Sequence, residues 1–142
     1  MTIDAQRFCS EFPSLGFEQP SAGVLEIIIA NEGRQNSATE SMHRDLAGIW
    51  RAIDADASVR AVLVRGAGEH FSSGGDFAMI ERMIEDEKTL VRGWREASDL
   101  VYNLVNCSKP VVSAIRGSAV GAGLAVALLA DVSVAGRTAK IL

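Results

Sequence analysis

Short runs of β-branched and aliphatic residues alternate along the chain with longer segments in which apolar residues recur every three or four positions. The short runs predict buried strands, and the longer segments predict amphipathic helices. The expected strands cover residues 24–29, 59–65, 111–115 and 131–135. This alternation predicts an α/β fold made of right-handed βαβ units around a mostly parallel sheet.

The first expected helix follows the polar loop 31–38 and has a single apolar stripe. The stripe is formed by Met42, Leu46, Ile49, Trp50 and Ile53. Two N-caps are compatible with the sequence: Ser37, which forms a capping box with Glu40, or Thr39. The pattern leaves both open.

Three more helices are expected, over residues 76–87, 90–106 and 121–130. The second of these has an apolar side that includes Trp94, so Trp94 and Trp50 are both expected in the core. The third is apolar on every side and is therefore expected to be buried all round.

The first 22 residues contain Phe8, Phe12 and Phe17 but no sustained period. They are expected to form a loose lead-in, and residues 23–142 to form one domain. His43 and His70 have no partner at a spacing typical of a metal site or a catalytic triad, and both are expected at the surface.

Two turns of small residues, 71–76 and 117–123, each lie between an expected strand and an expected helix. Such a turn leaves backbone N–H groups without partners at the start of the helix. If the two turns lie side by side, one N–H from each can hold a single carbonyl oxygen, as in an oxyanion hole. The plainer alternative for Gly121, Ala122 and Gly123 is close packing of a helix against the sheet.

Composition excludes several classes of protein. The chain has 142 residues, 48% of them hydrophobic, and a net charge of −4, with basic residues scattered rather than clustered. A disordered chain and a nucleic-acid-binding surface are therefore not expected. The first twenty residues do not resemble a secretory leader, and the longest run without charge has 14 residues, fewer than the ~20 needed to cross a membrane. A cytoplasmic protein is expected.

Three motifs resemble those of the enoyl-CoA hydratase/isomerase (crotonase) superfamily. Residues 71–76, Phe-Ser-Ser-Gly-Gly-Asp, resemble its F-x-[AS]-G-[AG]-D turn, and the stretch from Lys109 to Asp131 resembles its second glycine-rich block. The loop 31–39 resembles its N-x-P…N-A-L-[ST] motif, although the proline is missing here. The resemblance runs from about residue 24 to the end of the chain.

The resemblance implies an acyl-CoA substrate, no separate cofactor, and a homotrimer or hexamer for a full-length member. It implies that the backbone N–H groups of Ser73 and Ala122 form the oxyanion hole, and that Arg34 faces a CoA phosphate. The implied substrate-binding residues are Arg34, Asn36, Ala38, Ser73, Gly74, Gly75, Asp76, Gly121 and Ala122. No metal site is expected.

The chain also departs from the family pattern. Ala125 stands where hydratases often have a glutamate that handles the water, and the family's other catalytic carboxylate would lie beyond Leu142. The sequence is therefore expected to be the N-terminal half of the fold, apparently truncated, and to lack the acid or base when made alone. A non-catalytic protein that binds acyl-CoA or serves assembly is the alternative. A dinucleotide-binding domain is rejected, because Val126 stands where its last motif glycine would be.

Overall fold

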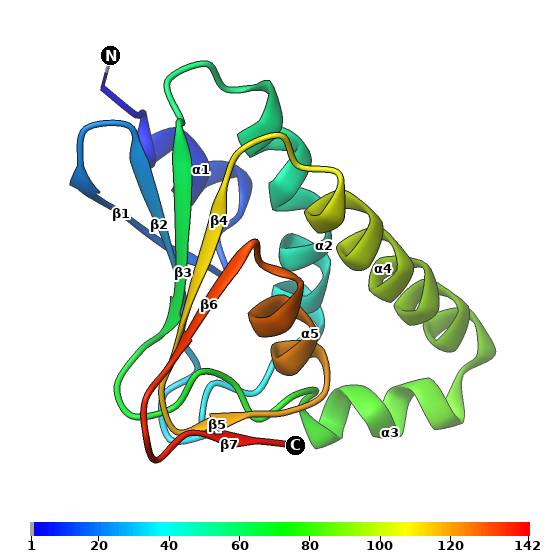
Figure 1. The fold of residues 1–142 in the computed structure, drawn as a ribbon. Helices are drawn as coiled ribbons and strands as arrows, with labels where there is room; N and C mark the ends of the chain where they lie inside the picture. The colour runs from blue at the N-terminus through cyan, green and yellow to red at the C-terminus, as the bar shows by residue number, and fades with distance from the viewer. Residues whose placement is uncertain (1) are drawn as a thin grey trace.

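Four parallel strands and one antiparallel edge strand form the main sheet, in the order β1-β2-β3-β4-β6 (Figure 1). The structure is a computed structural model and describes residues 2–142. The strands of this sheet are β1 (Gly16–Ser21), β2 (Val24–Ile29), β3 (Ala61–Gly66), β4 (Val111–Ile115) and β6 (Val132–Ala135). Two short strands, β5 (Ser118–Ala119) and β7 (Lys140–Ile141), pair separately. The α/β class with a mostly parallel sheet is thereby confirmed.

The longer helices lie on one face of this sheet, with α4 outermost (Figure 1). The helices are α1 (Ala5–Glu11), α2 (Glu40–Ala55), α3 (Phe77–Glu85), α4 (Glu87–Val105) and α5 (Ala122–Leu129). Among residues 2–142, no helix combines the length and the apolarity needed to cross a membrane.

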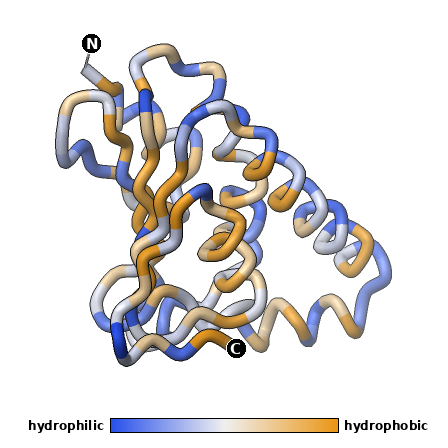
Figure 2. The backbone as a smooth tube through the Cα atoms, in the orientation of Figure 1, coloured by the Kyte–Doolittle hydropathy of each residue, from blue (hydrophilic) through white to orange (hydrophobic). Residues whose placement is uncertain are grey.

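The core lies between the sheet and α2, where Figure 2 shows mainly hydrophobic strands. Alternate residues of β2, namely Leu25, Ile27 and Ile29, are fully buried because successive side chains point to opposite faces. The predicted stripe of α2 is confirmed, since each of its five members is at most 2% exposed. The Thr39 hydroxyl accepts the Met42 N–H, so Thr39 is the N-cap.

The loose lead-in expected before residue 23 is instead a helix and a strand. Strand β1 pairs antiparallel with β2, and α1 is capped by the Asp4 side chain. Phe8 and Phe17 are buried with ring centroids 5.6 Å apart. The prediction failed because these elements are short and show no long period.

Helix α4 faces the core with a different side from the one predicted. Leu100 and Leu104 are buried, as is Asn103, whereas Trp94 is 66% exposed. The buried side includes polar groups that find partners on α2: Asn103 donates to the Ala47 carbonyl and accepts from Arg51, each at 2.8 Å. Because the inward face of α4 contains a buried asparagine, the spacing of apolar residues alone does not identify that face. The prediction that Trp94 lies in the core was therefore wrong.

Helix α5 is only partly covered. Gly123, Val126 and Ala127 are buried, but Leu128 is 51% exposed and Val132, just after the helix, is 53% exposed. The expectation of burial on all sides is therefore wrong for this chain. The Asp131 side chain accepts from the Val111 N–H at 2.8 Å and so joins the segment after α5 to the start of β4.

Candidate oxyanion site

The two glycine-rich turns lie side by side. Residue 72 pairs with the segment 118–120: the Ser72 N–H donates to the Ser118 carbonyl and the Val120 N–H to the Ser72 carbonyl, both at 3.0 Å. On its other side the first turn pairs with Ala38, whose N–H donates to the Gly74 carbonyl at 2.7 Å. The first turn is therefore held between the loop that precedes α2 and the segment that leads into α5.

Gly74 and Gly121 abut where the turns meet. Gly74 has φ +90° and Gly121 has φ +56°, conformations that other residues rarely adopt. A Cβ on Gly74 would lie 3.1 Å from the Val120 carbonyl oxygen, and one on Gly121 would lie 3.6 Å from the Gly74 Cα. The glycines thus bring two backbones together with no side chain between them, as the oxyanion-hole hypothesis requires.

The backbone N–H groups of Gly75, Gly121 and Ala122 at this junction have no acceptor within residues 2–142; Gly75 is in the first turn, and Ala122 is the first residue of α5. The Ser73 N–H, by contrast, donates to the Gln35 carbonyl at 3.0 Å. The prediction that Ser73 supplies a free donor is therefore wrong for this structure, and the free donor of the first turn belongs to Gly75.

Strand-like pairing explains why the Gly75 N–H is free. The Ala38 N–H donates to the Gly74 carbonyl, and the Ala38 carbonyl accepts from the Asp76 N–H at 2.9 Å. In such pairing the backbone groups of the intervening residue, Gly75, point away from the neighbouring segment. They are therefore directed away from Ala38, to the side on which the first turn meets residues 118–121.

Helix geometry frees the other donor. Ala122 is the first residue of α5, so its N–H has no intrahelical acceptor, and the Gly121 N-cap makes no side-chain capping bond. The start of a helix also has a partial positive charge that favours a negative oxygen. An oxygen accepting from both Gly75 and Ala122 would be stabilised by two fixed dipoles.

Asn36 holds the loop before α2 against the turn that precedes Phe71. Its side-chain Nδ2 donates to the backbone carbonyls of Ala67 and His70, each at 2.8 Å, and its side-chain Oδ1 accepts from the Asn31 N–H at 3.0 Å. Asn36 is 5% exposed. These contacts make it a positioning residue for the loop, whereas the sequence placed it among the substrate-binding residues.

Two other predicted site residues, Arg34 and Asp76, differ in the contacts that their side chains make. Arg34 is exposed, and its guanidinium has no hydrogen-bond or ion-pair partner among residues 2–142. Asp76 caps α3 by accepting from the Ala78 N–H at 3.4 Å. Arg34 is therefore available to a ligand, while Asp76 fixes the helix that follows Gly75.

His70 ties the two turns together. Its ring nitrogen Nδ1 accepts the Ser118 N–H at 3.1 Å, and the side chain is half-buried. The expected surface histidine is therefore part of the junction. Its pairing depends on contact between segments 48 residues apart, which no local pattern indicates.

A family model described as enoyl-CoA hydratase/isomerase matches residues 19–142. The chain belongs to this family. It is 34% identical over 129 residues to the enoyl-CoA hydratase AKT3-2 of Alternaria alternata, covering 90% of this chain and 43% of that relative. It is 32% identical over 122 residues to the 1,2-epoxyphenylacetyl-CoA isomerase of Escherichia coli K12, covering 83% of this chain and 46% of that relative.

Solved structures of the enoyl-CoA hydratase/isomerase family share the fold. An enoyl-CoA hydratase/isomerase from Mycobacterium paratuberculosis superposes with a TM-score of 0.85 at 28% identity, over 89% of this chain and 50% of that one. An enoyl-CoA hydratase from Shewanella pealeana gives 0.86 at 18% identity. The fold is that of the crotonase superfamily, and the chain spans about half the length of these relatives.

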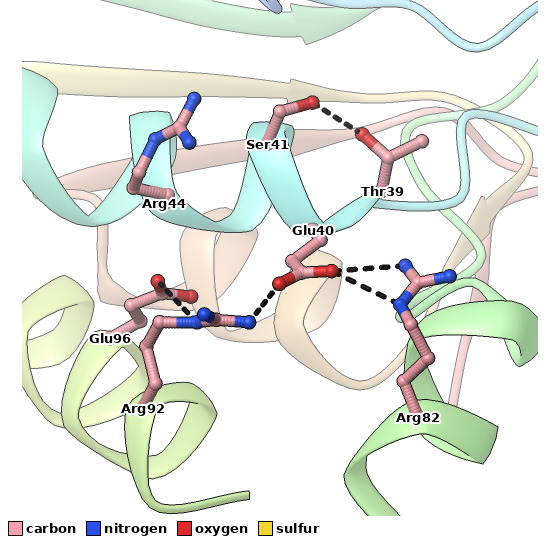
Figure 3. Close-up of a pocket in the computed structure, with 7 residues that line it drawn as sticks. All are labelled: Thr39, Glu40, Ser41, Arg44, Arg82, Arg92 and Glu96. Carbon is pink, nitrogen blue, oxygen red and sulfur yellow. Dashed lines mark hydrogen bonds and ion pairs between the residues drawn. The ribbon is translucent and has the colours of Figure 1, made fainter. Parts of the chain in front are cut away.

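A charged cleft of about 420 Å³ lies between α2, α3 and α4 (Figure 3). Glu40 occupies its centre and forms ion pairs with Arg82 of α3, at 3.1 Å, and with Arg92 of α4. Glu40 thus links all three helices. A carboxylate held between two guanidinium groups is stabilised in its charged form and serves here to join the helices.

Behind this cleft, His43 is buried, 5% exposed, and its Nδ1 lies 2.8 Å from Glu96. The surface location predicted for His43 is wrong, because the α2–α4 contact encloses it with an acidic partner. Cys107 is half-buried, and burial raises the pKa of its thiol. Both groups are explained by packing, and neither belongs to the junction of the two turns.

Proposed function

We propose that this chain forms the oxyanion-hole part of an acyl-CoA enzyme, in which the backbone N–H groups of Gly75 and Ala122 hold the thioester oxygen. The observation that carries the proposal is the junction of two turns at which these two N–H groups have no acceptor among the described residues. Membership of the enoyl-CoA hydratase/isomerase family makes a CoA thioester the natural substrate class.

The chemistry follows from where charge develops. Removing a proton next to a thioester carbonyl converts it to an enolate, whose negative charge lies largely on oxygen. Two donors fixed in advance stabilise this charge more than they stabilise the neutral carbonyl, and loss of one such donor has cost about 2.7–4 kcal/mol in other enzymes. The exposed Arg34 guanidinium is proposed to face a CoA phosphate.

The residue that moves the proton is not among those at this junction. Ala125, one turn into α5, has no ionisable group, and the nearby carboxylates of Asp76 and Glu40 cap a helix and form ion pairs. We therefore favour isomerisation, or another enolate reaction with a single base, over hydration by two glutamates. A homotrimer or hexamer, a cytoplasmic location and the absence of a separate cofactor remain parts of this proposal.

The second candidate is a non-catalytic protein that binds acyl-CoA, and Ala125 is the residue that favours it. Both candidates share the oxyanion site and differ in turnover. If the protein binds an enoyl-CoA but neither hydrates nor isomerises it, the binding function is supported. Measurable turnover excludes it.

Binding of a thioester can be compared with binding of its thioether analogue, in which CH₂ replaces the carbonyl. We expect the enoyl-CoA thioester to bind at least about tenfold more tightly, since two hydrogen bonds are lost with the oxygen. Isothermal titration of both ligands measures the difference. Equal affinity would show that no protein group recognises the carbonyl oxygen.

A further inference from the structure

The His70 ring makes the one side-chain hydrogen bond that joins the segments 70–76 and 117–123 within residues 2–142. Its Nδ1 accepts from the Ser118 N–H at 3.1 Å. The other hydrogen bonds between these segments join backbone groups, among them the bond from the Ser72 N–H to the Ser118 carbonyl at 3.0 Å. Both backbone groups of Ser118 are therefore held by the segment 70–76, and one of them is held by a titratable side chain.

Gly117 allows the ring to approach the second turn this closely. It has φ +56°, and a Cβ added to it would lie 2.6 Å from the His70 Nδ1. Strand β7 binds the other edge of this segment, where the Lys140 N–H donates to the Gly117 carbonyl at 2.8 Å. Because successive residues of a paired strand direct their backbone groups to opposite sides, the Ser118 N–H faces His70.

Only the neutral form of the ring can accept this hydrogen bond. A neutral imidazole has one N–H and one nitrogen that accepts, whereas an imidazolium has an N–H on both nitrogens. A proton on Nδ1 would point at the Ser118 N–H, so two donors would face each other with no acceptor between them. Because histidine is the side chain that changes charge between about pH 5 and pH 8, ordinary changes of pH can break this contact.

Water and protons can reach the ring. His70 is half-buried and lines a hollow of about 540 Å³, together with Glu32 and Glu69 among others. Within residues 2–142 His70 forms no ion pair, whereas His43 pairs with Glu96. The charged side chains on the segments that adjoin His70 are those of Glu32, Arg34, Glu69, Arg116 and Lys140. The bond to Ser118 is therefore the described contact that depends on the charge of the ring.

We propose that His70 is a positioning residue for the oxyanion site and that it acts only in its neutral form. This role rests on the proposed function, since it concerns the relative position of the Gly75 and Ala122 N–H groups. With the ring neutral, Ser118 is held against the first turn, and so is the segment that leads to Ala122. Protonation removes this bond, and the two donors no longer point at one oxygen. Recognition of the thioester oxygen therefore weakens as the pH falls.

Nuclear magnetic resonance of the free protein tests the contact without any ligand. As the pH falls from about 8 to about 5, the Ser118 amide proton is expected to shift along the same curve as the His70 ring and to exchange faster with water. The His43 ring, measured in the same spectra, is the control, and the Ser118 amide should not follow its curve. A Ser118 amide that stays unchanged over this range would overturn the proposal.

Ligand binding tests the effect on the oxyanion site. The readout is the ratio of the affinities for an enoyl-CoA and its thioether analogue, in which the titration of the shared CoA phosphates cancels. In the unaltered chain this ratio is expected to fall about tenfold between about pH 8 and pH 5, as for one lost hydrogen bond. His70→Asn places Oδ1 where Nδ1 lies and does not titrate, so it should keep the high ratio at both pH values. His70→Leu has no acceptor and should give the low ratio at both.

Circular dichroism at both pH values confirms that each variant is folded. If the ratio falls as much in His70→Asn as in the unaltered chain, the titration belongs to another group and the proposal is overturned. Equal ratios for His70→Leu and the unaltered chain at the higher pH would also overturn it. A protein that prefers the thioester at neither pH would refute the proposed function, and the Ser118 amide alone would then decide whether His70 holds the two turns together.

Discussion

Replacing Ala122 by proline is expected to remove most of the polarisation of a bound thioester carbonyl. Proline has no N–H, so one of the two proposed donors disappears. Ala122 is the first residue of α5, a position at which proline is compatible with the helix, so the fold should persist. In any form of the protein that turns over an acyl-CoA, kcat is expected to fall about 10²–10³-fold.

Isotope-edited infrared spectroscopy of a ¹³C-labelled thioester measures this polarisation directly. The carbonyl stretch of the bound ligand should shift to lower frequency in the unaltered protein, and Ala122→Pro should abolish most of that shift. Ser73→Ala is the matched control: it keeps the N–H that donates to Gln35 and removes only a hydroxyl bonded to the Arg34 carbonyl at 3.3 Å. A large effect of Ser73→Ala with a small effect of Ala122→Pro would reverse the assignment of the donors.

Replacing Gly123 by alanine is expected to destabilise the protein and to displace the oxyanion site. A Cβ there would lie 2.4 Å from the Ser72 Cβ and 2.7 Å from the Ser72 Oγ, closer than real contacts allow. Relieving the overlap must move α5 away from the first turn. The cost is expected to be about 1–3 kcal/mol of unfolding free energy, together with weaker binding of the thioester.

Gly48→Ala is the comparison variant, because it is expected to raise the free energy of unfolding whereas Gly123→Ala is expected to lower it. Gly48 lies inside α2, where an added Cβ would meet the Phe12 ring at 3.4 Å, an ordinary contact. Alanine is favoured over glycine within a helix by about 0.5–1 kcal/mol, so this variant should be slightly stabilised. Urea denaturation measures both. If Gly123→Ala were as stable as Gly48→Ala, the close approach of the two turns would be contradicted.

The sequence predicted the parts of the fold that depend on local pattern. β-branched runs identified β2, β3 and β4, and the 3.6-residue period identified α2 with every member of its buried stripe. The period alone could not tell which side of α4 faces inward. That choice is decided by Asn103 and Glu96, whose partners Ala47, Arg51 and His43 lie on another helix.

In the candidate site, too, local pattern predicted some features and long-range contacts decided the others. Small residues between a strand and a helix predicted two turns with free N–H groups, and the turns do lie together. Which N–H is free depends on the loop before α2, where Gln35 and Asn36 have φ of +49° and +56°. Positive φ at residues other than glycine has no clear sequence signal, and this loop supplies the carbonyl that engages Ser73. The sequence therefore located the turn but named Ser73 in place of Gly75.

A crystal structure of the protein with a bound enoyl-CoA tests the central claim most directly. The account predicts that the thioester oxygen lies about 2.7–3.1 Å from both the Gly75 and the Ala122 backbone nitrogens, as expected for an oxyanion hole. The Ser73 N–H should remain bonded to Gln35. A thioester oxygen bound elsewhere, or held by Ser73 with Gly75 turned away, would contradict the assignment of the site.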